Sequence, residues 1–118
     1  MICGLEAPHP IALIETRGRE WFDTVNGNSY HATRTYVTYT DGTTATVYGA
    51  FEYGYGTQYE YTAFDALEAA GIIQDRARYK WGGGEVPWQY CQDRGIKYIR
   101  TIETDAYTRR DVEEWGEQ

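Results

Sequence analysis

Few side chains in this 118-residue sequence have the chemistry of a nucleophile or a general base. The chain has two histidines, His9 and His31, two cysteines, Cys3 and Cys91, and one serine, Ser29. Hydrolases and transferases that use nucleophilic catalysis need a nucleophile within hydrogen-bonding distance of a base. No spacing in the sequence places either histidine beside Cys91 or Ser29. We therefore expect a protein that is not an enzyme.

The residue spacing gives equally weak indications of a metal site or a ligand site. The cysteines and histidines match neither a C-x-x-C nor an H-x-x-x-H spacing, so we expect no metal, no cofactor and free thiols. A carboxylate pair such as Glu52 and Glu60 stays open as an acid–base site. The Gly54–Gly56 turn leads into an expected helix, and with Arg34 and nearby tyrosines it could form a small-ligand or nucleotide site. That site is an alternative to protein binding.

Charge narrows the choice of partner. The sequence has 18 acidic and 11 basic residues, a formal net charge of −7. Proteins that neutralise phosphates need clustered lysine and arginine, so we expect no direct nucleic-acid binding. Six of the basic residues lie within residues 74–102. This stretch supplies a further alternative, a nucleic-acid contact through Arg76, Arg78 and Lys80 with Trp81 stacking on a base.

Tyrosine is the unusual feature of the composition. The chain has 12 tyrosines, and eight of them fall between residues 30 and 61. Tyrosine favours strands, so these side chains could simply cover the outer face of an antiparallel sheet. Tyrosine is also enriched in interfaces, because it offers a large contact area at a low cost in rotamer entropy. A recognition surface is therefore the second interpretation.

The first half of the chain predicts three strands. Hydrophobic alternation favours a strand over residues 11–22, followed by a turn at residues 25–29. Strands over residues 29–40 and 43–53 are joined by Asp41-Gly42, a dipeptide typical of a two-residue type I′ hairpin. In that register Thr40 faces Thr43 and Tyr30 faces Tyr53. The side with Tyr30, Ala32 and Tyr36 is then the expected core face.

The second half predicts helices and one more strand. Thr57 and Glu60 form the pattern of a capping box for a helix over residues 58–70, which ends before Gly71. A short helix is expected from Pro87 to about Gly95, a strand over residues 97–103 and a helix over residues 109–115. The prediction is one α+β domain, residues 1–118, with a three- to four-stranded antiparallel sheet. The main helix packs on one face, and the C-terminal helices are short.

No segment indicates a membrane or an export pathway. The longest apolar runs are well below the roughly 20 residues that a membrane helix needs. The N-terminal 20 residues lack a basic region followed by a long apolar run, which a secretory signal would have. We expect a cytoplasmic protein that does not bind membranes.

Four short motifs within about residues 20–70 carry a resemblance to known proteins. They are Trp21–Asp23 (WFD), Asn26–His31 (NGNSYH), Phe51–Gly56 (FEYGYG) and Gln58–Tyr59 (QY). With them the sequence resembles small uncharacterised accessory proteins of phages and mobile elements. Small acidic phage proteins without catalytic motifs include many antagonists of host defence, so the resemblance implies an inhibitor of the anti-CRISPR kind, acting in the infected host cell.

The resemblance and the lack of catalytic residues together lead to one functional hypothesis. The protein is expected to bind a host protein or ribonucleoprotein complex and to inhibit it by steric occlusion. The contacts are expected from tyrosines and acidic residues of the helices. These candidate residues are Tyr55, Tyr59, Glu60, Asp65, Glu68, Asp111, Glu113 and Glu114.

Overall fold

The chain folds as an α+β domain, which confirms the expected class. A computed structural model describes residues 10–54, 56–80, 83–104 and 107–117. The elements follow the order β1 (Ile11–Asp23), β2 (Asn28–Tyr39), β3 (Thr44–Tyr53), α1 (Gln58–Ala69), α2 (Pro87–Asp93), β4 (Lys97–Glu103) and α3 (Arg109–Trp115). All seven lie within about two residues of the positions that the sequence predicts. No helix in the described part of the chain is long and apolar enough to cross a membrane.

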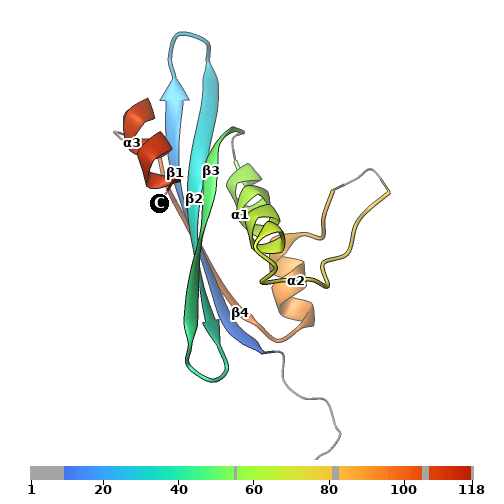
Figure 1. Ribbon diagram of the computed structural model, residues 1–118. Coiled ribbons are helices and arrows are strands. Elements are labelled where there is room, and N and C mark those ends of the chain that lie inside the picture. Colours follow the sequence, from blue (N-terminus) through green and yellow to red (C-terminus); the bar gives the residue numbers. More distant parts are fainter. Residues whose placement is uncertain (1–9, 55, 81–82, 105–106, 118) are drawn as a thin grey trace, which may run out of the picture.

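The four strands form one mixed sheet in the order β3-β2-β1-β4. The pairs β1–β2 and β2–β3 are antiparallel, as expected, whereas β4 pairs with β1 in parallel. The expectation of a wholly antiparallel sheet is therefore wrong at this edge. The reason is the connection, because α1 and α2 lie between β3 and β4 and carry the chain back to the end of the sheet where β1 begins (Figure 1).

The β2–β3 turn has three loop residues instead of the expected two. The amide of Tyr39 donates to the carbonyl of Thr43 (2.8 Å), and the amide of Gly42 donates to the carbonyl of Tyr39 (2.9 Å). Gly42 has a φ of 90°, the left-handed geometry of a loop that ends in a glycine bulge. Strand pairs next to the turn are therefore shifted by one residue from the prediction. A bulge opposite Ala32 restores the predicted pairing of Tyr30 with Tyr53.

Val47 of β3 packs against the core, and the shift places Thr35 of β2 beside it instead of Tyr36. Because successive side chains of a strand point to opposite sides, the whole buried face of β2 changes with it. His31, Thr33, Thr35 and Val37 are buried on the face that packs on α1. The expected core face, with Tyr30, Ala32 and Tyr36, is instead the face toward α3 and solvent. The prediction of the core face is therefore wrong, although Val47 of β3 does pack against the core.

The core lies between the sheet and α1 and α2. Ile14 and Val37 of the sheet cluster with Phe64 and Leu67 of α1 and with Tyr90 of α2. The ring of Phe64 meets that of Tyr90 edge-on, with centroids 5.9 Å apart. Gly71 ends α1 with a φ of 77°, and the amide of the following Ile72 donates to the carbonyl of Leu67, as the sequence predicts for a C′ glycine.

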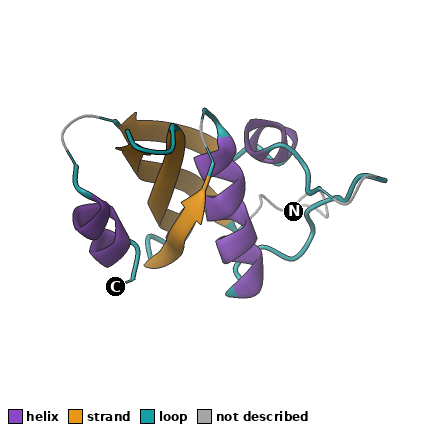
Figure 2. Cartoon of the chain, turned by 90° about the horizontal axis from the view of Figure 1, so that it is seen from above, coloured by secondary structure: helices purple, strands orange, loops and turns teal. Residues whose placement is uncertain are grey.

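Helix α3 covers the opposite face of the sheet, as the view along the strands in Figure 2 shows. Its expected capping box is confirmed, since the amide of Asp111 donates to Thr108 Oγ1 and the amide of Thr108 donates to Asp111 Oδ2. The Trp115 ring lies against two guanidinium groups of the sheet, those of Arg19 (4.7 Å) and Arg34 (4.8 Å). These cation–π contacts hold the helix on the sheet.

The sheet centre has room for backbone but not for larger side chains. A Cβ at Gly116, the residue after α3, would lie 2.6 Å from the Cβ of Ala32 and 2.8 Å from the carbonyl oxygen of Gly49. On the other face, a Cβ at Gly49 would lie 2.1 Å from Thr33 Oγ1 and 3.3 Å from Cγ2 of Thr62 in α1. Both helices therefore pack closely at one point of the sheet.

This close packing predicts that Gly49→Ala lowers the free energy of unfolding by about 1–3 kcal/mol, the usual cost of overpacking. The buried hydroxyl of Thr33 has no hydrogen-bond partner among the described residues, so Thr33→Ala removes the obstacle without breaking a hydrogen bond. Denaturant unfolding should show a smaller cost of Gly49→Ala in the Thr33→Ala background. An equal cost in both backgrounds would contradict the account.

Candidate functional site

The β1–β2 hairpin projects beyond α1 and α3 at one end of the sheet (Figure 1). Asp23 fixes its turn, because Asp23 Oδ1 accepts hydrogen bonds from the amides of Val25 (3.0 Å) and Asn26 (3.2 Å) and Oδ2 accepts one from Asn26 Nδ2 (2.8 Å). The amide of Gly27 closes the turn by donating to the Asp23 carbonyl (2.7 Å). The hydrogen bond from the Asn26 side chain is the main reason that the pKa of Asp23 is lowered. The tip is thus an ordered turn.

Three large apolar side chains are exposed at this end. Val25 in the turn is 89% exposed, Phe22 at the end of β1 is 51% exposed, and Tyr53 at the end of β3 is 60% exposed. We call Phe22, Val25 and Tyr53 the hairpin end. Exposed apolar side chains scattered singly are ordinary, but at a projecting end of a hairpin they are accessible to a partner.

Stacked rings on the face toward α3 stiffen the base of the hairpin. Tyr30 stacks on Phe51 with centroids 5.2 Å apart, and it contacts Trp21 at 5.6 Å and Tyr53 at 5.6 Å. Arg109 of α3 lies over Phe51, with its guanidinium carbon 5.6 Å from the ring centroid. The exposed Tyr53 ring therefore belongs to a packed cluster that spans three strands and is held by a helix.

On the opposite face of the same strands, a buried histidine joins the sheet to α1. His31 is 1% exposed, and its Nδ1 lies 3.1 Å from the carbonyl oxygen of Gly54 while its Nε2 lies 2.7 Å from Thr62 Oγ1. Burial lowers the pKa of His31, although the Gly54 carbonyl and Glu52 act in the other direction. A neutral ring fits these contacts, with Nδ1 donating to Gly54 and the Thr62 hydroxyl donating to Nε2 at 2.7 Å in preference to Glu52 Oε2 at 3.3 Å. His31 therefore has a structural role.

Acidic side chains border the hairpin end. Glu20 and Glu52 are the strand partners of His31 in β1 and β3, so the three residues form one row across the sheet. Glu52 is exposed, and Asp23 lies at the start of the turn. Partial burial raises the pKa of Glu20. An apolar projection with acidic neighbours suits a partner with a basic surface.

The structure separates the contact residues expected on α1. Tyr59 is 5% exposed and Glu60 is 3% exposed, so both lie in the interior. They do not form the exposed contact surface that the sequence analysis expects. Tyr59 packs over Gly18 of β1, and the lack of a side chain at this glycine makes room for the ring. Asp65 and Glu68 remain at the surface, but both are ion-paired with Arg76, at 2.7 and 2.9 Å.

The acidic residues of α3 lie on a different face of the molecule. Asp111 is exposed and caps its own helix. Glu113 and Glu114 pair with Arg109 (3.2 Å) and Arg110 (2.8 Å) one turn earlier. The remaining candidate, Tyr55, lies outside the described residues.

Two of the basic residues of the possible nucleic-acid contact, Arg76 and Arg78, are paired with carboxylates in the fold. The Arg76 side chain is fully buried, whereas Arg78 is half exposed and pairs with Glu68 at 2.7 Å. Lys80 is exposed, and Trp81 lies outside the described residues. A nucleic-acid contact that includes the Arg76 side chain is therefore wrong for this structure, because a buried and paired guanidinium does not reach a phosphate.

The expected ligand site at the start of α1 is not assembled with Arg34. The Arg34 guanidinium lies on the α3 face of the sheet, where its Nε donates to the carbonyl oxygen of Trp115 (3.1 Å) and its guanidinium carbon lies 5.2 Å from the centroid of the Tyr48 ring. The one-residue register shift places Arg34 opposite Tyr48 instead of Gly49. Within the described residues, no three or more His, Cys, Asp or Glu side chains are grouped so that they could hold a metal ion.

Sequence reasoning missed the hairpin end itself. The sequence analysis places Val25 in the turn and Phe22 at the end of the first strand, and it gives neither residue a role in binding. The available signal was an apolar residue within a run of turn-forming polar residues, directly beside the aromatic pair Trp21-Phe22. Comparisons of the chain with protein-family models, with curated proteins and with solved structures find no match.

The buried His31 predicts a specific dependence of stability on pH. Its pKa is lower in the folded state than the ordinary value of about 6.5, so the unfolded chain binds more protons below that pH. The stabilisation is complete above pH 6.5 and is lost as the pH falls toward the lower folded pKa. The slope contributed by this one proton is at most about 1.4 kcal/mol per pH unit.

Urea unfolding of the wild type and of His31→Gln, measured from pH 7.5 to pH 4.5, tests this prediction. The difference between the two free energies of unfolding should shrink as the pH falls below 6.5. His9→Gln, which removes the other histidine of the sequence, is the matched control and should follow the wild type. A constant difference across this range would refute a buried neutral His31.

Proposed function

We propose that this protein is a non-enzymatic binding protein that occludes a surface of a protein partner and makes its main contacts through the hairpin end. The observation that carries the proposal is the exposure of Phe22, Val25 and Tyr53 at the projecting end of a stiff hairpin. Binding hot spots are enriched in aromatic anchors, and a preorganised contact surface loses less conformational entropy on binding. A protruding apolar tip suits a recessed site on the partner.

The residues that carry the resemblance support the choice of partner. The WFD and NGNSYH motifs form the end of β1, the start of β2 and part of the turn between them. The FEYGYG motif contains Phe51 and Tyr53 of the aromatic cluster. Within this proposal the partner is a host defence complex, and its basic surface, of the kind that binds nucleic acid, is met by Glu20, Asp23 and Glu52.

The environment of the reactive side chains also favours binding over catalysis. Cys91 is buried in the core, and burial raises the pKa of its thiol to about 12. A thiol with such a pKa is a poor nucleophile at neutral pH. His31 is engaged at both ring nitrogens by Gly54 and Thr62, so it has no free nitrogen for a substrate.

The test is an affinity capture from host extract followed by a binding titration with the isolated partner. Phe22→Ala combined with Val25→Asp should weaken the complex at least tenfold, because it removes two apolar contacts and adds a charge at the tip. Both side chains are exposed, so folding should be unaffected. Circular dichroism and thermal unfolding check the fold of the variant.

Thr44→Ala is the matched control, since Thr44 is exposed and begins β3 at the end of the sheet opposite the hairpin end. It should leave the affinity unchanged. Full affinity of the hairpin variant, or an equal loss with Thr44→Ala, would contradict the proposed contact surface.

A further inference from the structure

Two adjoining cavities lie on the α1 and α2 side of the molecule and share Trp88 and Arg100 in their lining. The larger has a volume of about 510 Å³ and is lined by Trp88 of α2 together with Tyr98 and Arg100 of β4. The smaller has a volume of about 270 Å³ and is lined by Glu60 and by the same Trp88 and Arg100. We call this pair of cavities the Trp88 groove. Its combined size is in the range of small-ligand sites.

A buried carboxylate forms the polar wall of the groove. The Glu60 side chain is 5% exposed, and its Oε1 accepts hydrogen bonds from the Tyr98 hydroxyl (2.8 Å) and from Arg100 Nη1 (3.4 Å). Its Oε2 accepts none from the part of the chain that the structure describes. The expected capping box is absent, since Thr57 makes no side-chain cap and Glu60 is turned toward Tyr98. Glu60 therefore offers an acceptor to the smaller cavity.

Two further features keep this acceptor and its neighbours in place. Burial raises the pKa of Tyr98, so its hydroxyl stays protonated and continues to donate to Glu60. Arg100 is half exposed and has one nitrogen on Glu60, which leaves other N–H groups of its guanidinium for a ligand. An acceptor and a set of donors therefore stand side by side on one wall.

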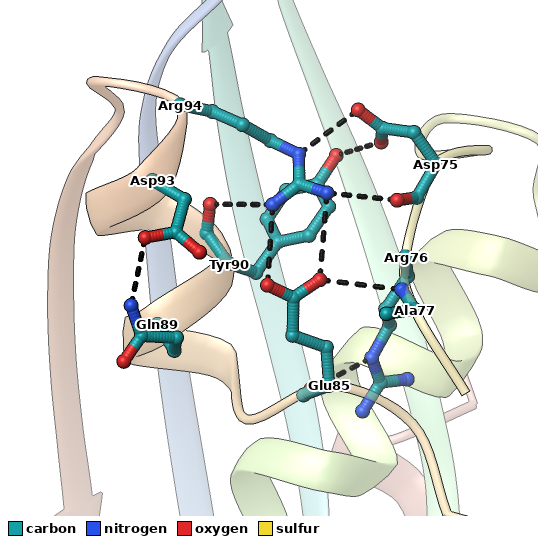
Figure 3. A network of polar contacts seen from close by, with 8 residues as sticks. All are labelled: Asp75, Arg76, Ala77, Glu85, Gln89, Tyr90, Asp93 and Arg94. Atoms are coloured by element: carbon teal, nitrogen blue, oxygen red, sulfur yellow. Dashed lines mark hydrogen bonds and ion pairs between the residues drawn. The ribbon is translucent and has the colours of Figure 1, made fainter. Parts of the chain in front are cut away.

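Trp88 supplies an apolar surface on a rigidly anchored helix. In Figure 3 the Arg94 guanidinium at the end of α2 joins that helix to the segment before it, contacting Asp75 through Nε (2.9 Å), the Asp75 carbonyl through Nη2 (2.7 Å) and Glu85 (3.4 Å). The Tyr90 hydroxyl donates to Asp75 Oδ1 as well. Pro87 begins the helix immediately before Trp88. Trp88 is 48% exposed on this anchored helix, so its indole is available to stack on a planar ring.

We propose that the Trp88 groove binds a single guanine base, either in a free nucleotide or unpaired in a strand. Stacked on Trp88, guanine presents N1–H and the exocyclic amine as donors beside O6 as an acceptor. Glu60 Oε2 accepts from the donors, and Arg100 donates to O6 or N7, the commonest specific contact of arginine with a base. Unpaired bases are recognised in this way, by stacking on aromatic rings and by hydrogen bonds to their edges.

The electrostatics assign the recognition to the base and not to the phosphate. The chain has a net charge of −7, and the nearby Arg76 and Arg94 are already paired with carboxylates. Guanosine should therefore bind within about threefold of guanosine monophosphate, and the affinity should change little between 50 and 200 mM salt. Adenosine monophosphate, which has an amine where guanine has O6, should bind at least tenfold more weakly.

The experiment is isothermal titration calorimetry of the full chain with the four nucleoside monophosphates, with guanosine and with an oligoadenylate that contains one guanine. Trp88→Ala and Glu60→Gln should each weaken binding of guanosine monophosphate at least tenfold, whereas Trp88→Phe should retain much of it. Thr44→Ala, an exposed position at the start of β3 that lines neither cavity, is the matched control and should bind as the wild type does. Thermal unfolding confirms that each variant is folded.

Any one of three results would overturn the proposal. They are equal affinity for all four nucleotides, no heat of binding at millimolar guanosine monophosphate, and binding that survives Trp88→Ala. Tighter binding of the oligonucleotide than of the mononucleotide assigns the guanine to a strand, and equal binding assigns it to a free nucleotide. Because the hairpin variants do not touch this groove, failure here leaves the proposed protein contact unaffected.

Discussion

The close approach of two helices to opposite faces of one point in the sheet is the constraint on which the other features depend. Gly49 leaves room for Thr33 and Thr62 on the α1 face, and its carbonyl lies where Gly116 follows α3 on the other face. Interiors are packed nearly as densely as crystals, so an added methyl group at such a point displaces a helix. The absence of side chains here lets a four-stranded sheet carry a helix on each side.

The two helices fix the hairpin end from both faces. Through α1, Thr62 reaches His31, and His31 holds the end of β3 by its contact with the Gly54 carbonyl. Through α3, Arg109 lies on the aromatic cluster at Phe51. The hairpin therefore extends from a base that is clamped on both sides, and its exposed apolar side chains are presented in one arrangement. Such preorganisation is what a rigid binding surface needs.

Local signals in the sequence predicted the helices and strands, whereas non-local contacts determine which of their side chains are buried. Gly71 and Pro87 mark helix ends through their own backbone geometry, so those boundaries were predictable. The Asp41-Gly42 turn was recognised, but one additional loop residue reversed the faces of β2. Burial of Glu60 depends on Tyr98, 38 residues away, and burial of Arg76 depends on α1. No periodicity within a segment encodes either contact, so the burial of these two side chains could not be derived in advance.

Site-specific photocross-linking tests the central claim, contact of a protein partner by the hairpin end, most directly. A photoreactive phenylalanine derivative would replace Val25 in one protein and Ala69, exposed near the end of α1, in another. After irradiation in host extract, we predict a single adduct of defined mass from position 25 and none from position 69. An adduct to the same partner from position 69, with none from position 25, would contradict the account.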